Sequence, residues 1–183
     1  MGILTFGINV TLDGCCDHEV GIADEELHDY FTQLMDESGA MLWGRTTYEM
    51  MESAWPAIAR DAQQPRALRE WAVKLEAKPK YVASRTRHAY SWANTIHLQG
   101  ELGEAVRRLK EQTPAGVLVG SLKLGGELER LGLVDEYRFM IQPVLAGRGP
   151  KLFDGLPSVR RLERVAVRTL KGGQTAIHYR RPH

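Results

Sequence analysis

Three short segments of the chain place glycines, hydroxyl groups and arginines directly after a run of apolar residues. The segments are Gly44-Arg45-Thr46-Thr47, Ser84-Arg85-Thr86 and Gly120-Ser121. Glycine lets the backbone approach a ligand closely, hydroxyl groups donate hydrogen bonds to phosphate oxygens, and arginine binds phosphate through a planar, bidentate fork. Each segment alone is more simply an ordinary turn in which Ser or Thr caps a helix. Together the three favour a nucleotide as the ligand.

Each of these segments must be held by the strand that we expect before it. The apolar runs lie at residues 40–43, 81–83 and 117–119. In open α/β sheets, ligands bind outside the carboxyl ends of the strands, where the N-termini of helices present free N–H groups and a partial positive charge. The sequence therefore predicts that three segments distant in the chain lie along one edge of a sheet.

The common nucleotide-binding motifs are absent from the sequence. There is no G-x-G-x-x-G pattern. Residues 120–127, Gly-Ser-Leu-Lys-Leu-Gly-Gly-Glu, have the glycine spacing of a P-loop, but Gly126 and Glu127 stand where Lys and Ser or Thr are required. Phosphoryl transfer is therefore unsupported. The pair Gly125-Gly126 is explained as well by close packing of a helix on the sheet.

Apolar spacing predicts the remaining elements. We expect further strands at residues 3–10, 95–98, 137–145, 165–170 and 175–180. We expect helices over residues 25–35 after a cap at Asp24, briefly from about residue 46, and over 68–75, 101–112 and 124–131. Residues 53–65, rich in Ala, Pro, Gln and Asp, are expected to be irregular. Pro143 cannot donate to a sheet, so it implies an edge, a bulge or a strand end.

The order of these elements predicts a single α/β domain over residues 1–183, with a mainly parallel sheet and an antiparallel C-terminal hairpin. The chain has 183 residues, 43% of them hydrophobic and 26% charged. No stretch approaches the roughly 20 apolar residues that a membrane span requires. The N-terminus carries no export signal, so we expect a cytoplasmic protein. Cys15 and Cys16 are adjacent, which suits neither a disulfide framework nor a zinc site with spaced ligand pairs, and we expect no metal.

The formal net charge of +1 conceals an uneven distribution. Residues 158–183 contain seven basic residues and one acidic residue, which leaves 17 basic and 22 acidic residues in residues 1–157. A basic C-terminus can bind nucleic acid. The alternative, which we favour, is that these arginines alternate with apolar residues in the hairpin and form its solvated face.

Longer stretches resemble known proteins. The three segments, with Tyr48-Glu49 after the first, resemble the three cofactor segments of the dihydrofolate reductase fold. The stretch Leu-Gly-Leu-Val-Asp-Glu-Tyr at 131–137, followed by Gln-Pro-Val-Leu-Ala-Gly-Arg-Gly at 142–149 and Leu-Phe at 152–153, resembles more closely the reductase domain of bifunctional riboflavin-biosynthesis deaminase-reductases and its stand-alone relatives. The early Leu12-Asp13-Gly14 does so too. The resemblance covers nearly the whole chain, and implies a three-layer dihydrofolate reductase-like fold with a mixed sheet of about eight strands.

The resemblance implies an NADPH-dependent reductase. The first segment would hold the pyrophosphate and adenosine phosphates, the second the 2′-phosphate and adenine, and the third the pyrophosphate and nicotinamide. The cofactor-binding residues implied in this way are Gly44, Arg45, Thr46, Thr47, Ser84, Arg85, Thr86, Gly120, Ser121 and Leu122. The two arginines agree with it, because fixed positive charge favours the additional phosphate of NADPH over NADH.

In the riboflavin-pathway relatives, the reduction converts a ribosylamino group to a ribitylamino group. The resemblance thus implies a small heterocyclic or ribosylamino-pyrimidine substrate. The candidates for catalysis are Asp13 and His28, and Asp13, Phe31 and Tyr48 are the candidates for contact with the substrate. Asp13 is explained equally well as the first position of a tight Asp-Gly turn. His28 could be a solvated helix residue, and Phe31 is more simply a core residue.

A rival interpretation is a nucleotide-binding protein without catalytic activity, which serves as a sensor or interaction module. Association is a separate expectation. Apolar and aromatic residues concentrate in the strand at 137–145 and in the C-terminal hairpin, where a second subunit would cover an exposed sheet edge. The family relatives are typically dimers through this region, and we expect a homodimer.

Overall fold

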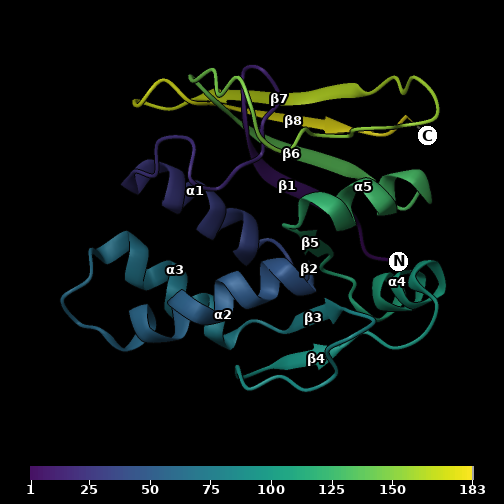
Figure 1. Ribbon diagram of the computed structural model, residues 1–183, viewed down its shortest axis with the longest axis horizontal. Coiled ribbons are helices and arrows are strands. Elements are labelled where there is room, and N and C mark those ends of the chain that lie inside the picture. Colours follow the sequence, from purple (N-terminus) through teal and green to yellow (C-terminus); the bar gives the residue numbers. More distant parts are fainter. Residues whose placement is uncertain (183) are drawn as a thin grey trace.

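A computed structural model, which describes residues 1–182, contains one eight-stranded sheet between two layers of helices (Figure 1). The strands are β1 (Leu4–Thr11), β2 (Ala40–Gly44), β3 (Lys80–Ala83), β4 (Thr95–His97), β5 (Val117–Val119), β6 (Glu136–Gln142), β7 (Glu163–Thr169) and β8 (Thr175–Arg180). Their order is β4-β3-β2-β5-β1-β6-β8-β7. The first six in this order pair in parallel, and β8 is antiparallel to both β6 and β7. The predicted mainly parallel sheet with an antiparallel C-terminal hairpin is confirmed.

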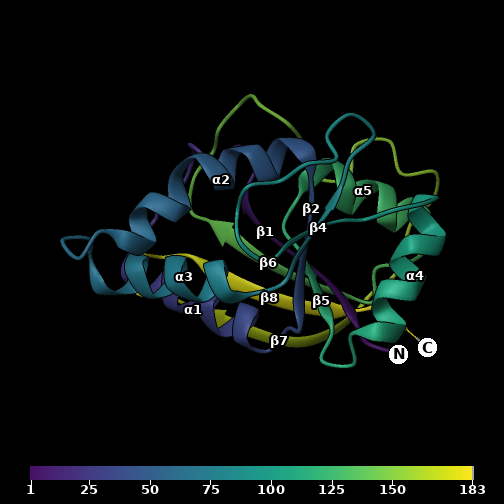
Figure 2. The ribbon, with the colours of Figure 1, turned by 90° about the horizontal axis from the view of Figure 1, so that it is seen from below.

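The helices cover both faces of the sheet. They are α1 (Glu25–Asp36), α2 (Arg45–Arg60), α3 (Arg66–Ala77), α4 (Leu102–Gln112) and α5 (Leu122–Arg130). Figure 2 shows α1, α2 and α3 grouped on one side and α4 and α5 on the other. Within residues 1–182, no helix combines the length and the apolarity needed to cross a membrane.

The alternation of side chains along β1 explains this three-layer arrangement. Phe6 is fully buried on the face covered by α5, where it lies against Gly125. Gly7 lies on the opposite face, against Leu34 of α1. Successive side chains of a strand point to opposite faces, so one strand contributes to two cores. The central strands are therefore buried on both sides, as is usual for parallel sheets.

The structure corrects one predicted segment. Residues 53–65 were expected to be irregular, but α2 continues to Arg60 with Pro56 inside it. A proline in a helix interior costs about 3 kcal/mol because it removes a hydrogen bond and crowds the preceding turn. Packing offsets this cost, because the ring of Trp55 meets that of Trp71 on α3 edge to face at a centroid distance of 6.0 Å. Tertiary contacts therefore override the local composition.

Two other local predictions are confirmed. Asp24 caps α1, since its Oδ1 accepts a hydrogen bond of 2.8 Å from the backbone N–H of Leu27. Strand β6 ends at Gln142, directly before Pro143, so this proline marks a strand end. The chain after Pro143 then forms the loop that packs against the end of β1.

Candidate active site

The three predicted segments lie along one edge of the sheet. Strands β3, β2 and β5 are consecutive neighbours and parallel, so their carboxyl ends share an edge. The backbone N–H of Gly44, at the end of β2, donates a hydrogen bond of 3.0 Å to the hydroxyl oxygen of Ser121, after β5. Ser121 is only 3% exposed. Its hydroxyl group therefore joins the first segment to the third.

Two helix N-termini open side by side at this edge. Helix α2 begins after Gly44 and α5 begins after Ser121, and within the described chain neither residue caps its helix with a side-chain hydrogen bond. In contrast, carboxylates cap α1 and α4 through Asp24 and Glu101. The first N–H groups of an uncapped helix carry a partial positive charge and can bind an anion. Helix α3, which begins after Pro65, also has no side-chain cap, but only α2 and α5 follow predicted phosphate-binding segments.

The two arginines of these segments are open to solvent. The guanidinium of Arg45 is half-exposed, and its Nη1 lies 3.9 Å from Glu49 Oε1, too far for a hydrogen bond. Arg85 is exposed, and it forms no ion pair with any residue in 1–182. The hydroxyl oxygen of Ser84 accepts hydrogen bonds from the N–H groups of Thr86 and Arg87, at 3.2 and 2.9 Å, and so closes the turn that carries Arg85. Two helix N-termini and two guanidiniums are a donor set that fits a phosphate-bearing cofactor.

The carboxylate of Asp13 holds the loop at residues 146–151. It accepts hydrogen bonds from Thr11 Oγ1 (2.5 Å) and from the backbone N–H groups of Ala146 (3.0 Å) and Gly147 (2.8 Å), and Lys151 Nζ lies 3.4 Å away. These donors, the Thr11 hydroxyl above all, hold the pKa of Asp13 well below its ordinary value. The carboxylate is therefore ionised at neutral pH and cannot donate a proton. Its contacts extend to a loop more than 130 positions away in the sequence, beyond the Asp-Gly turn that the sequence suggested.

His28 lies apart from Asp13. Its ring is half-buried on α1 and meets the ring of Trp55 on α2 edge to face, at a centroid distance of 6.3 Å. Burial lowers the pKa of His28 below its ordinary value, so the imidazole is neutral at pH 7. Within residues 1–182, no hydrogen bond or ion pair joins His28 to Asp13. The structure does not assemble the two predicted catalytic residues into one hydrogen-bonded unit.

The position of Tyr48 disagrees with its prediction as a residue that contacts the substrate. Tyr48 is fully buried, its hydroxyl donates a hydrogen bond of 2.7 Å to Glu52 Oε1, and its ring packs on that of Tyr90. The reason is helix phase, because Tyr48 lies in the first turn of α2 on the side that faces the sheet. Phe31 is half-buried, packed edge to face on Tyr30 and against the core, which agrees with its alternative as a core residue.

The comparisons with known proteins agree with this architecture. Residues 3–175 match the family model described as the RibD C-terminal domain. The chain belongs to the RibD C-terminal domain family. It is 30% identical over 174 residues to the uncharacterized protein YyaP of Bacillus subtilis (strain 168), covering 93% of this chain and 90% of YyaP.

Two solved structures show the same fold as this RibD C-terminal domain. One is a protein of Shewanella sp. PV-4 that is provisionally assigned to riboflavin biosynthesis, with a TM-score of 0.77, 19% identity and 99% of each chain covered. The other is dihydrofolate reductase from Enterococcus faecalis complexed with NADP(H) and RAB-propyl, with a TM-score of 0.66, 12% identity, and 100% and 98% coverage. The predicted dihydrofolate reductase-like fold is confirmed.

The sequence alone did not reveal two polar residues near the site of this RibD C-terminal domain. Glu52 on α2 accepts a hydrogen bond of 2.8 Å from Arg87, which follows the second segment. They are 35 positions apart, and nothing in their spacing indicates a pair. A cavity of about 170 Å³ lies elsewhere, between α1 and the strands β6, β8 and β7, and its lining includes Arg138, Arg168 and His178. It contains none of the predicted site residues.

Proposed function

We propose that this protein is an NADPH-dependent reductase that transfers a hydride to a small heterocyclic or ribosylamino-pyrimidine substrate. The observation that carries the proposal is the pair of uncapped helix N-termini, α2 and α5, joined by the Gly44–Ser121 hydrogen bond and flanked by the exposed Arg45 and Arg85. Membership of the RibD C-terminal domain family supports it. So does the fold shared with a reductase complexed with NADP(H).

Each group has a distinct part in binding. The N–H groups of Arg45, Thr46 and Thr47 in the first turn of α2 would bind the pyrophosphate, together with those that begin α5 at Leu122. The guanidiniums of Arg45 and Arg85 would bind the 2′-phosphate. The remaining segment residues, which hold these groups in place or add hydroxyl and backbone contacts, are Gly44, Ser84, Thr86, Gly120 and Ser121. Bound NADPH supplies the hydride, and the protein's task is to align it and exclude water.

On the substrate side, His28 is the better candidate of the two predicted catalytic residues. Its neutral imidazole can both donate and accept a hydrogen bond, and can therefore orient a heterocycle. Asp13 would act indirectly, because its carboxylate fixes the loop at 146–151 beside the end of β1.

A single domain of this kind would act as a cytoplasmic homodimer. Strand β7 forms an edge of the sheet, every residue of it is exposed, and Val165 and Val167 are 47% and 51% exposed. An exposed, partly apolar edge strand is normally covered, and a second copy of the chain would cover it. Light scattering that gives a 20.6 kDa particle at micromolar concentration would contradict this part of the proposal.

The first test titrates the full chain with NADPH and with NADH and monitors binding by fluorescence. We expect NADPH to bind more tightly. Arg45→Gln and Arg85→Gln should each weaken NADPH binding by about tenfold to a hundredfold, the value of a hydrogen bond to a charged group. Arg107→Gln removes an exposed arginine from the middle of α4, outside the three segments, and should have no effect. Equal binding of the two nucleotides would remove the roles given to Arg45 and Arg85.

Turnover is measured separately, as NADPH oxidation at 340 nm with the ribosylamino-pyrimidine, dihydrofolate and a panel of carbonyl compounds. Consumption of NADPH with one of them identifies the substrate class. Tight binding without turnover on any of them would favour the rival function, a nucleotide-binding sensor or interaction module.

A further inference from the structure

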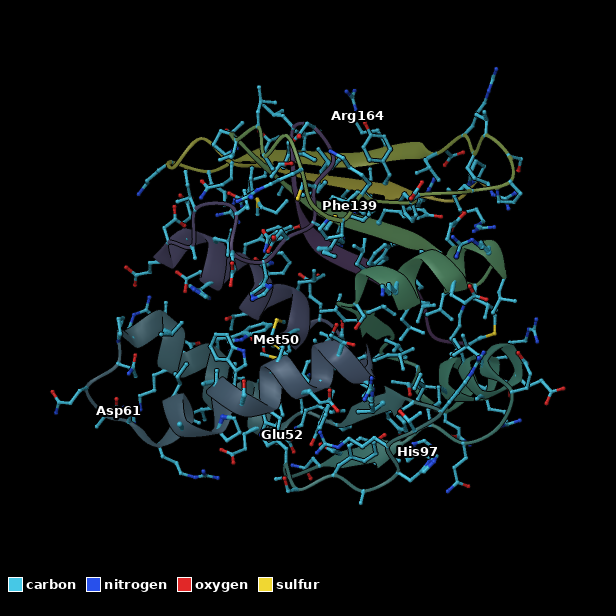
Figure 3. The ribbon with its side chains drawn as sticks, in the orientation of Figure 1. Met50, Glu52, Asp61, His97, Phe139 and Arg164 are labelled. Carbon is cyan, nitrogen blue, oxygen red and sulfur yellow. The ribbon has the colours of Figure 1, made fainter. Side chains whose placement is uncertain are left out.

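A polar network joins α2 to the chain between β3 and β4. Its centre is the carboxylate of Glu52, which lies between α2 and this chain (Figure 3). Glu52 Oε1 accepts hydrogen bonds from the hydroxyl groups of Tyr48 (2.7 Å) and Ser91 (2.8 Å), and Oε2 accepts one from Arg87 Nη2 (2.8 Å). All three donors are satisfied by one side chain. These donors hold the pKa of Glu52 below its ordinary value against the opposing effect of burial, so the carboxylate is charged at neutral pH.

The guanidinium of Arg87 is held by several contacts. It lies against the rings of Tyr48 and Tyr90, which pack edge to face on each other, with its Cζ 4.8 and 5.3 Å from their centroids. Its Nε donates to the carbonyl of Ala89 at 3.1 Å, and the hydroxyl of Tyr90 donates to the carbonyl of Arg87 at 2.6 Å. Stacking and the planar fork together define one orientation, which a lysine would not reproduce.

Arg87 also fixes the turn that contains Arg85. Its backbone N–H donates to the hydroxyl oxygen of Ser84, which is the first residue after β3. The chain from Ser84 to Asn94 has no helix or strand of its own. A connection of this length is normally mobile unless side chains hold it. The Glu52–Arg87 pair therefore ties the second cofactor segment to the helix whose N-terminus carries the first.

Glu49 provides a further contact between the first and second cofactor segments. Its Oε1 lies 3.9 Å from Arg45 Nη1 and 3.6 Å from Arg87 Nη1. One carboxylate therefore lies between an arginine of the first segment and the arginine that closes the second.

We propose that Glu52 and Arg87 are positioning residues that set the preference for NADPH over NADH. The proposal rests on the proposed function. By holding the Ser84–Arg87 turn against α2, the pair keeps Arg85 at a fixed place relative to Arg45. A phosphate can then bind both guanidiniums without first ordering the loop. NADH lacks the 2′-phosphate and gains nothing from this arrangement.

The test compares the nucleotide preference of matched variants of the full chain. Glu52→Gln removes the charge that binds Arg87. Its control is Glu76→Gln, which removes a carboxylate that pairs with Arg60 of α2 at 3.1 Å and has a similar side-chain exposure, 28% against 20% for Glu52. We expect Glu52→Gln to weaken NADPH binding about fivefold to tenfold, the penalty for ordering a long side chain at each binding event, and to leave NADH binding within about twofold. Glu76→Gln should leave the ratio unchanged.

Two further variants make the result independent of folding defects. Ser91→Ala removes one of the three donors to Glu52 and should lower the NADPH preference in the same direction by a smaller factor. Arg87→Lys keeps the charge and loses the fork and the stacking, so it should lose the preference; retention of the preference would overturn the proposal. Equal loss of both nucleotides in Glu52→Gln would also overturn it, because a merely structural role predicts that result.

The two proposals fail in different ways. A wild-type protein that binds neither nucleotide contradicts the proposed function itself. A wild-type protein that prefers NADPH, with the same ratio in Glu52→Gln, contradicts only the positioning role.

Discussion

Two adjacent glycines in α5 should respond in opposite directions to the same substitution. Gly125 faces the sheet, and a Cβ placed on it would lie within 2.7 Å of three carbons of the Phe6 ring. Gly126 is the next residue, and a Cβ there would meet nothing within 4 Å. Gly125→Ala and Gly126→Ala therefore differ in packing while they share the same helix and the same change of side chain.

The Phe6 ring cannot move aside. It is fully buried and packs edge to face on Phe139 and Phe153, at centroid distances of 5.5 and 5.7 Å. Insertion of a methyl group into such a core costs about 1–3 kcal/mol through displaced side chains and backbone. Alanine also favours a helix over glycine by about 1 kcal/mol, and this gain applies to both variants. The free energy of unfolding should therefore rise by up to about 1 kcal/mol in Gly126→Ala, and should be about 1–3 kcal/mol lower in Gly125→Ala than in Gly126→Ala.

The assay is urea unfolding of both variants and the wild type, followed by tryptophan fluorescence. The difference between the two variants isolates the packing effect because the helix preference cancels. Nucleotide titration gives a second readout, since displacement of α5 would also move Ser121 away from Gly44 and weaken NADPH binding in Gly125→Ala alone. Equal stability of the two variants would refute the close packing of α5 on β1.

Two further predictions concern ionisable residues. Asp13→Asn removes the charge of this side chain and replaces one of the two oxygens that accept hydrogen bonds from residues 146 and 147 with an NH2 donor, so at pH 7 the variant should unfold at a lower temperature than the wild type. Because the folded-state pKa of Asp13 is depressed, this stabilisation is present above the ordinary value of 3.8 and is lost as pH falls. The difference in unfolding temperature between the variant and the wild type should therefore be smaller at pH 3. An equal difference at both pH values would exclude a role for the charge. Lys80 is fully buried and its Nζ donates to the carbonyls of Leu75, Glu76 and Lys78 at the end of α3, so Lys80→Met should lower the free energy of unfolding by about 1–3 kcal/mol in urea titrations at pH 7. Burial lowers the pKa of Lys80 from 10.5 to about 8, so between these pH values the unfolded chain binds more protons than the folded chain. The stability of the wild type relative to the variant should therefore rise from pH 8 to pH 10. A constant difference in stability would contradict the depressed pKa.

The strands of the sheet could be predicted because each one has a recognisable local pattern in the sequence. The runs before Gly44, Ser84 and Gly120 are short, apolar and end at small or polar residues, and the structure has β2, β3 and β5 there. The adjacency of their carboxyl ends follows from parallel pairing. The link between Gly44 and Ser121 could not be predicted, since it depends on the order β2-β5 in the sheet and not on any local pattern.

The errors in α2 share one physical cause. Tyr48, Glu52 and Trp55 stand at i, i+4 and i+7, the spacing of one helix face. The proline at 56 and the Ala, Pro, Gln and Asp content of residues 53–65 conceal this face, because local preference favours a loop there. A helix that ends early shows too little of this face for Tyr48 to be recognised as buried, so it remains a candidate for contact with the substrate. In the folded chain, contact between Trp55 and Trp71 extends the helix and turns Tyr48 inward.

The folded chain brings its oppositely charged parts together. Basic residues of 158–183 form ion pairs with acidic residues of 1–157, because Arg168 pairs with Glu26 at 3.7 Å and Arg181 pairs with the buried Glu129 at 2.9 Å. Arginines that are balanced in this way have less positive charge to offer a nucleic acid, which supports the paired, solvated face over that alternative. Arg85 has no carboxylate partner in the described part of the chain, and it follows β3 at the same edge of the sheet as the N-termini of α2 and α5. A chain with almost no net charge can therefore bind an anion where one arginine is left unbalanced beside two uncapped helices.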